Sequence, residues 1–239
     1  MSRSGPAIRL TLCVPEESEI RINLEFVIAF KINPIRSFIT NVSWFEKYPG
    51  IPWLAAPIVS DDTSSDLQDS WRLDFLLHEK EILSHTYSRL RPIIKQMKML
   101  RNTQKWTCLK NYFIDTIFLN NLEELGKDLN EQSKTSMFFK MLKTLREVCE
   151  QCKIDYFWKP SINLMEGSDP SEMMTIANRI GDIIQDIENN IKTQSFILAK
   201  YILTGDELKT LADKSRLHGH KYSGVNLQDL YKITKQDDM

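Results

Sequence analysis

Alternation of apolar and polar residues marks the first third of the chain. Apolar side chains occupy every second position across Ile20–Lys31, which is typical of a strand with one buried face. Shorter apolar runs at Ala7–Val14 and Trp53–Val59 predict two more strands. Pro15–Ser18 favours a hairpin connection, and Ser60–Ser70 is a polar loop. The front of the chain is therefore expected to contribute a piece of sheet.

After Trp71 the pattern changes to the period of a helix. Apolar residues recur at helical spacing through Phe138–Cys152 and again through Ile176–Ile191. Ser168–Ser171 is a helix start signal directly before the second of these stretches. Ser195–Met239 favours one or two short helices. The pattern predicts an α+β fold in which an antiparallel sheet leads into a helical bundle.

The composition is that of a folded domain, with 42% hydrophobic and 26% charged residues. Four cysteines and the lack of an apolar signal region favour a reducing compartment, so we expect a cytoplasmic protein. No apolar run approaches the roughly 20 residues that span a bilayer. No membrane partner is expected.

The net charge of −1 hides a strong segregation of charge along the chain. Between Ser84 and Ile114 there are seven basic residues and no acidic one. One helix face is expected to carry four of these cations, namely Lys95, Lys98, Arg101 and Lys105. Such a stripe can bind nucleic-acid phosphates, but it is also typical of a solvated helix face. The sequence leaves both interpretations open.

Three residues are candidates for nucleotide chemistry. Glu25 lies on the polar face of its predicted strand, where a metal-binding carboxylate or an ordinary solvated side chain gives the same pattern. Arg72 can form a bidentate contact with guanine or phosphate, or pair with Asp69 or Asp74 at a helix start. Tyr112 can stack on a base or pack half-buried in the core.

A zinc site is not expected. Cys149 and Cys152 have ligand-like spacing, but both fall on the apolar stripe of a predicted helix, where a free cysteine behaves as a small hydrophobic residue. His218 and His220 are isolated from other ligand types. The cysteines are therefore expected in the core.

The segment Trp71–Leu83 closely resembles the same stretch of cyclic GMP-AMP synthase and its relatives, which contain the Mab-21 nucleotidyltransferase domain. Ser4–Ile8, Ile22–Glu25 and Arg91–Phe118 resemble further parts of that family. Only Ser84–Leu90 stands where the vertebrate enzymes insert a zinc-binding loop. The chain therefore resembles the zinc-less insect cyclic GMP-AMP synthase-like receptors.

The resemblance implies three parts. Residues 1–70 correspond to the C-terminal part of the nucleotidyltransferase core sheet, residues 71–192 to the helical Mab-21-type lobe, and residues 193–239 to a C-terminal extension. The sheet is then a partial one. The extension has no counterpart in the family that we can place.

The resemblance also implies roles for individual residues. Glu25 takes the place of the third metal-binding acid, which is catalytic and holds Mg²⁺ or Mn²⁺ in the complete enzyme. Nucleotide contacts are implied for Arg72, Glu79, Arg91, Lys95, Asn111 and Tyr112. Arg91 matches a phosphate-contacting lysine, with Lys95 as the alternative. Asp115 departs from the family pattern, because it replaces a lysine.

The implied function is a nucleotidyltransferase of innate immune sensing. Such an enzyme makes a cyclic dinucleotide from ATP and GTP when it binds double-stranded nucleic acid, with RNA favoured over DNA and a homodimer formed on the nucleic acid. In the family, two further acids form a Glu-x-Asp motif after a Gly-Ser loop, and this sequence contains no such arrangement. We therefore expect this chain to be inactive as it stands. The alternative is a non-enzymatic nucleotide- or nucleic-acid-binding module or decoy of the same family.

Overall fold

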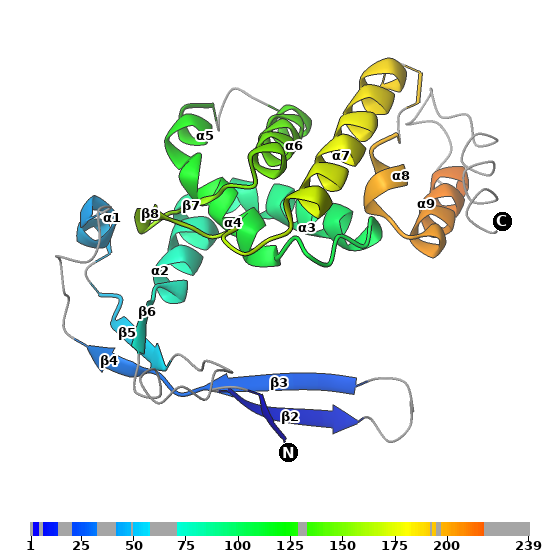
Figure 1. The fold of residues 1–239 in the computed structure, drawn as a ribbon. Coiled ribbons are helices and arrows are strands. Elements are labelled where there is room, and N and C mark those ends of the chain that lie inside the picture. The colour runs from blue at the N-terminus through cyan, green and yellow to red at the C-terminus, as the bar shows by residue number, and fades with distance from the viewer. Residues whose placement is uncertain are drawn as a thin grey trace. The chain divides into compact units, whose positions relative to one another are not determined.

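The computed structural model describes residues 2–4, 7–13, 21–32, 42–48, 50–57, 71–128, 133–191, 193–194 and 197–217 (Figure 1). The chain divides into two compact units, Met1–His85 and Thr86–Met239. The predicted hairpin connection at Pro15–Ser18, the polar loop Ser60–Ser70 and the histidines at 218 and 220 lie outside the described residues. The three-part division suggested by the resemblance stays a prediction.

The first unit contains an antiparallel sheet in the order β1-β2-β3. Its strands are β1 (Ser2–Ser4), β2 (Ala7–Cys13) and β3 (Arg21–Val27). The strand predicted from Ala7 is confirmed as β2. The single strand predicted over Ile20–Lys31 is wrong, because it ends at Val27 and the chain resumes as β4 (Phe30–Ile32) in a different sheet. Alternation assigns residues to a face of a strand, but it does not reveal a change of pairing partner.

The second sheet has the order β4-β5-β6, with β5 (Trp53–Pro57) and β6 (Trp71–Asp74) antiparallel to each other. A short helix, α1 (Val42–Lys47), lies between β4 and β5 in the chain. Trp53 packs edge-to-face against Phe75, with ring centroids 5.6 Å apart.

The segment Trp71–Leu83 changes from strand to helix, as its pattern predicts. β6 ends at Asp74, whose side-chain Oδ1 accepts a hydrogen bond of 2.9 Å from the backbone N–H of Leu76. α2 (Leu76–Glu81) follows, then a π-helical turn at Ile82–Thr86 and a 3₁₀ turn at Ser88–Leu90. Aspartate at this position satisfies an N–H group that has no partner within the helix.

The second unit is a helical lobe with one small hairpin. Its helices are α3 (Arg91–Thr103), α4 (Asn111–Asn120), α5 (Leu122–Asp128), α6 (Lys134–Gln151), α7 (Pro170–Asn190), α8 (Ala199–Ile202) and α9 (Gly205–Leu217). The hairpin strands are β7 (Asp155–Tyr156) and β8 (Lys159–Asn163). α6 and α7 pack together along their length (Figure 1).

Both long helices begin where their sequences direct them. The side chain of Ser133 accepts from the backbone N–H of Ser136 at the start of α6. Asp169 caps α7 in the same way through Ser171, with Pro170 in the first turn. The start signal at Ser168–Ser171 is thus confirmed. The predicted helical stripes are confirmed except at their last residues: Cys152 and Ile191 lie beyond the ends of α6 and α7, where Cys152 is only partly buried and Ile191 is 46% exposed.

Apolar residues from every long helix meet in the core of the lobe. The fully buried ones include Ile93, Leu100, Phe118, Phe138, Leu142, Leu145, Ile180 and Trp158. Cys149 is also buried, and burial raises the pKa of its thiol to about 12, so the thiol is protonated at neutral pH. Cys152 follows α6 in a left-handed conformation with φ of 49°.

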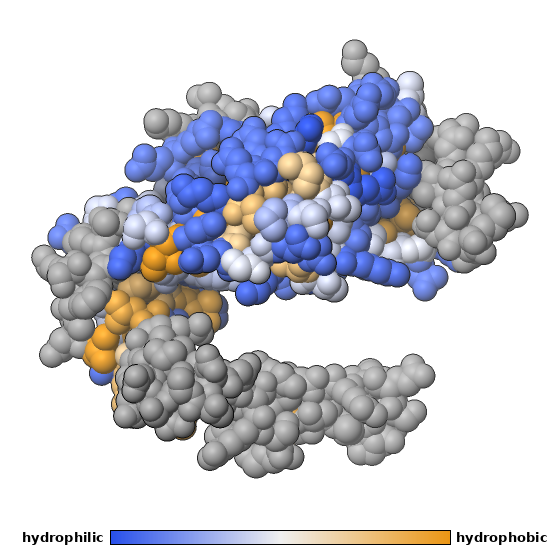
Figure 2. All heavy atoms as spheres, viewed as in Figure 1, coloured by the Kyte–Doolittle hydropathy of each residue, from blue (hydrophilic) through white to orange (hydrophobic). Residues whose placement is uncertain are grey.

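The surface differs between the two units. Figure 2 shows mainly hydrophilic side chains on the visible face of the helical lobe and hydrophobic ones around β4 and β5. Phe26 and Phe30 are 53% and 57% exposed in the first unit. No helix within the described ranges combines the length and apolar character that crossing a membrane requires. The α+β fold predicted from the sequence is confirmed.

Candidate functional site

The predicted basic stripe separates into two kinds of cation. Lys95 is exposed on α3, and so is Arg91 at its N-terminal end, whereas Lys98 and Arg101 are only partly exposed. Lys105 is exposed but lies beyond the C-terminal end of α3, in a turn where its φ is 56°. The prediction that one helix face carries all four cations of the stripe is therefore wrong for Lys105.

Lys98 forms an ion pair within the helical lobe. Its Nζ lies 2.7 Å from the carboxylate of Asp115 on α4, and the two side chains are 30% and 25% exposed. Burial raises the pKa of Asp115, and the hydrogen bond and charge of Lys98 lower it. The aspartate that departs from the family pattern thus has a partner within the lobe.

We expect the substitution Lys98→Met to destabilise the lobe by about 1–2 kcal/mol, between the values for exposed and buried ion pairs. The variant leaves the half-buried carboxylate of Asp115 without its cation. Without Lys98 the pKa of Asp115 in the folded variant should rise further above its value in the unfolded chain, so the ionised carboxylate opposes folding and the protonated one does not. The deficit relative to wild type should therefore shrink as the pH falls from 7 toward the ordinary range of Asp, near 3.8.

Urea denaturation at several pH values measures this effect. The double variant Lys98→Met/Asp115→Asn is the control, because it removes both charges and should recover part of the lost stability. A deficit that stays constant with pH would contradict the interpretation.

Arg101 has a structural role at the end of α3. Its Nε donates to the carbonyl of Leu109 at 2.6 Å, and its Nη2 donates to the carbonyl of Thr107 at 3.1 Å. These bonds close the loop between α3 and α4, which buries Trp106 and Leu109. The guanidinium fork suits such a pair of acceptors.

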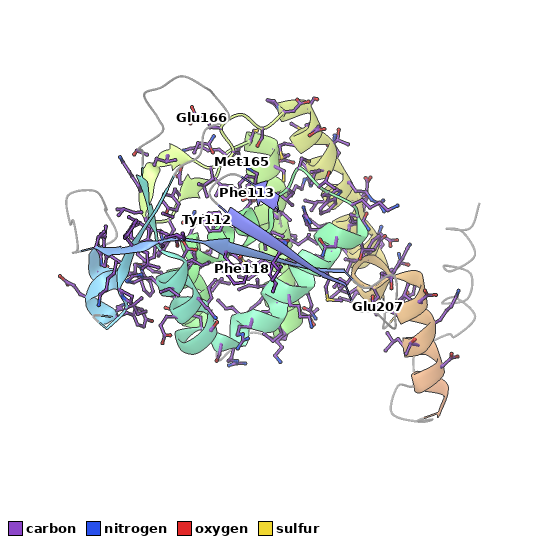
Figure 3. The ribbon with its side chains drawn as sticks, turned by 90° about the horizontal axis from the view of Figure 1, so that it is seen from below. Tyr112, Phe113, Phe118, Met165, Glu166 and Glu207 are labelled. Atoms are coloured by element: carbon purple, nitrogen blue, oxygen red, sulfur yellow. The ribbon has the colours of Figure 1, made fainter. Side chains whose placement is uncertain are left out.

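α4 carries the two candidates for base contact. Asn111 is exposed and Tyr112 is half-buried in its first turn, while Phe113 and Phe118 are buried (Figure 3). The backbone carbonyl of Tyr112 accepts a hydrogen bond of 2.9 Å from the hydroxyl of Thr116. The buried hydroxyl of Thr116 thereby finds its partner in the first turn of the same helix.

The candidates on α3 and α4 do not meet at one point. The contacts Lys98–Asp115 and Arg101–Leu109 show that α4 runs back along α3 from its C-terminal end. Tyr112 is therefore level with the last turns of α3, whereas Arg91 begins that helix. Seven residues from Arg91 to Lys98 correspond to about 10 Å at a rise of 1.5 Å per residue.

The remaining candidates belong to the first unit. In the backbone register, Glu25 of β3 pairs with Arg9 of β2, and Arg72 of β6 pairs with Ala56 of β5. Glu79 is only 4% exposed on α2. Glu25 and Arg72 thus lie in different three-stranded sheets.

The role implied for Glu25 is to help to hold a magnesium or manganese ion. Among the residues that the structure describes, no three of the types His, Cys, Asp and Glu gather as a metal-ligand group. A magnesium site built around Glu25 therefore stays a prediction.

Two polar features of the lobe were not assigned a role from the sequence. Lys110 is exposed before α4, with its Nζ 5.5 Å from the centre of the Phe113 ring. Arg179 of α7 donates to the side chain of Gln104 at 3.0 Å, beside the loop that follows α3. The position of Lys110 within the basic stretch of the sequence could have marked it as a candidate for phosphate binding. No sequence pattern around Arg179 indicates its contact with Gln104.

Residues 89–182 match the Mab-21 protein HhH/H2TH-like domain. Most of the chain is also similar to proteins named cyclic GMP-AMP synthase-like receptor. The one from Microplitis demolitor is 32% identical over 216 residues, 89% of this chain and 38% of the relative. The one from Trichogramma pretiosum is 29% identical over 96% of this chain and 47% of the relative.

A third receptor of that name, from Ctenocephalides felis, is 28% identical over 91% of this chain and 50% of the relative. The chain thus spans half or less of the length of these curated relatives. It belongs to the Mab-21 family, and within that family it is cyclic GMP-AMP synthase-like. The family predicted from Trp71–Leu83 is confirmed.

Proposed function

We propose that the chain is part of a nucleotidyltransferase-type innate immune sensor whose helical lobe binds double-stranded RNA. The contacts are assigned to the exposed cations Lys95 and Lys105. One observation carries the proposal: these side chains are exposed along α3 and the turn after it, in a stretch of sequence that has no acidic residue. Lys98 and Arg101 are given a structural role instead, because both are bonded within the lobe.

The spacing of these cations suits a regular phosphate backbone. Lys95 lies eight residues before Thr103, the last residue of α3, which is about 12 Å at the helical rise per residue, and Lys105 follows in the turn after the helix. Double-stranded RNA is bound mainly through its shape and its phosphate and 2′-hydroxyl groups. Cations that reach phosphates along α3 and the turn after it fit that mode, and no base needs to be read.

Nucleotide handling is proposed for the complete protein on the strength of family resemblance. Glu25 would help to hold Mg²⁺ or Mn²⁺, and Arg72, Glu79, Asn111 and Tyr112 would position the bases of ATP and GTP. Arg91, or Lys95 one turn later, would contact phosphate. The product would be a cyclic dinucleotide, made in the cytoplasm by a protein that dimerises on nucleic acid.

The RNA-binding proposal predicts a large effect of Lys95→Glu/Lys105→Glu. We expect this double variant to bind an RNA duplex of about 30 base pairs at least tenfold more weakly, and its salt slope to fall by about 2. Fluorescence anisotropy at about 50 and 200 mM salt measures both quantities.

The matched control is Lys134→Glu/Lys159→Glu, which changes the charge equally at exposed lysines elsewhere in the same unit. This control should bind RNA within about twofold of wild type. An equal loss in the two double variants would overturn the assignment to α3, because net charge alone would then explain the binding. Wild-type protein that binds no duplex would overturn the RNA proposal as a whole.

A further inference from the structure

Arg179 of α7 lies beside the C-terminal end of α3, and its side chain is exposed. Its Nε donates a hydrogen bond of 3.0 Å to the side-chain oxygen of Gln104, the residue that directly follows α3. Lys105, one of the two cations assigned to RNA, comes next in the chain, so its Cα lies about 3.8 Å from that of Gln104. A cation of α7 is thus bonded to the turn that carries Lys105.

The aromatic ring of Tyr201 on α8 lies against the same guanidinium group. The Cζ of Arg179 is 5.8 Å from the centre of the ring, within the range of a cation–π contact. Tyr201 is 6% exposed, and its hydroxyl donates to Asp186 of α7 at 2.5 Å. α8 is also bonded to α3, because the hydroxyl of Thr103 donates to the carbonyl of Ile202 at 3.0 Å. An amide and a held ring therefore restrain the position of Arg179.

The guanidinium of Arg179 keeps donors for a ligand. Within the described ranges it donates through Nε alone, and no carboxylate there forms an ion pair with it. Arg101 differs, since it donates through Nε, Nη1 and Nη2 to oxygens of the chain. Asp186 of α7 is bonded to Tyr201 and lies 3.5 Å from the Nζ of Lys200. The outer N–H groups of Arg179 can therefore form a bidentate contact with phosphate.

We propose that Arg179 is a further RNA-binding residue, which contacts phosphate beside Lys105 and is positioned by Gln104 and Tyr201. The inference rests on the proposed RNA binding by α3 and extends that surface to α7. A side chain that is already restrained loses less conformational entropy on binding, so its contact should contribute more affinity than that of an unrestrained cation. α8 would then support the RNA-binding surface from within the lobe.

Arg179→Met tests this assignment with the same RNA duplex. We expect the affinity to fall by about three- to tenfold at about 50 mM salt, and the salt slope to fall by about 1, because one phosphate contact is lost. Arg179→Lys should keep the slope but recover only part of the affinity, since an ammonium group lacks the fork that bonds Gln104 and phosphate together. Fluorescence anisotropy at two salt concentrations measures both quantities.

Arg146→Met on α6 is the matched control, because it removes the same charge from the same unit. The side chain of Arg146 is 43% exposed and pairs with Glu150 at 2.8 Å. This control should bind RNA within about twofold of wild type. An equal loss in Arg146→Met and Arg179→Met would overturn the assignment, because net charge alone would then explain the effect.

Gln104→Met tests the positioning, because it removes the acceptor for Arg179 without a change of charge. We expect RNA binding to weaken by about two- to threefold in the wild-type background and to stay unchanged in the Arg179→Met background. The same loss in both backgrounds would show that Gln104 does not act through Arg179. If Lys95→Glu/Lys105→Glu weakens RNA binding but Arg179→Met does not, this inference fails and the proposed function stands. If the wild-type protein binds no duplex, both fail.

Discussion

The substitution Trp158→Ala is expected to lower the free energy of unfolding of the helical lobe by about 3–5 kcal/mol. Trp158 is 0% exposed and is the largest fully buried side chain among the described residues. It lies in the turn between β7 and β8, with its ring 4.8 Å from that of Phe157 in an edge-to-face arrangement. Its removal leaves a cavity in the core.

The frame around Trp158 is rigid, so the cavity should not collapse. Asn163 Oδ1 accepts hydrogen bonds of 2.9 and 3.0 Å from the backbone N–H groups of Ile154 and Met165. The side chain of Asn120 on α4 donates to the carbonyl of Asp155 at 2.8 Å. These bonds hold the hairpin on the lobe when the ring is absent, which puts the expected cost toward the upper end of the range.

Urea denaturation followed by circular dichroism measures the loss. Ile162→Ala on β8 is the matched control, because Ile162 is 41% exposed and its truncation should cost less than about 1 kcal/mol. If the two variants lose the same stability, the ring of Trp158 does not fill the core as described.

Local signals explain which parts of the fold were predictable from the sequence. α7 follows from an apolar stripe and from Asp169-Pro170 at its start, all of which lie within one continuous segment. The hairpin of β7 and β8 was not predicted, because strands of two and five residues are too short to show a period. The break between β3 and β4 was missed because its alternation continues unchanged across Ile28 and Ala29.

The sequence predicts which cations lie on α3, but it does not predict which residues they contact. The spacing of Lys95, Lys98 and Arg101 placed them on α3, which the structure bears out. The partners of Lys98 and Arg101 come from α4 and from the loop before it, and no pattern within α3 can reveal them. A helical pattern also continues to Lys105, although the chain leaves the helix at Gln104 to form the loop that Arg101 closes.

Arg101→Met is expected to destabilise the lobe by about 2–4 kcal/mol, because two backbone carbonyls lose a charged donor at once. Arg101→Lys keeps the charge but cannot reach the carbonyls of Leu109 and Thr107 together, so it should recover less than half of the loss. Urea denaturation measures both variants. Hydrogen exchange of residues 104–110 should also rise in both, because the loop opens.

The same pair of variants separates a loop clamp from a phosphate ligand. A clamp predicts that Arg101→Lys loses stability while RNA affinity per folded molecule remains within about twofold of wild type. A phosphate ligand predicts wild-type stability for Arg101→Met together with weaker RNA binding and a salt slope lower by about 1. Wild-type stability with weaker RNA binding would show that Arg101 contacts RNA phosphate. It would contradict the division of the cations into exposed ones that bind RNA and internally bonded ones that do not.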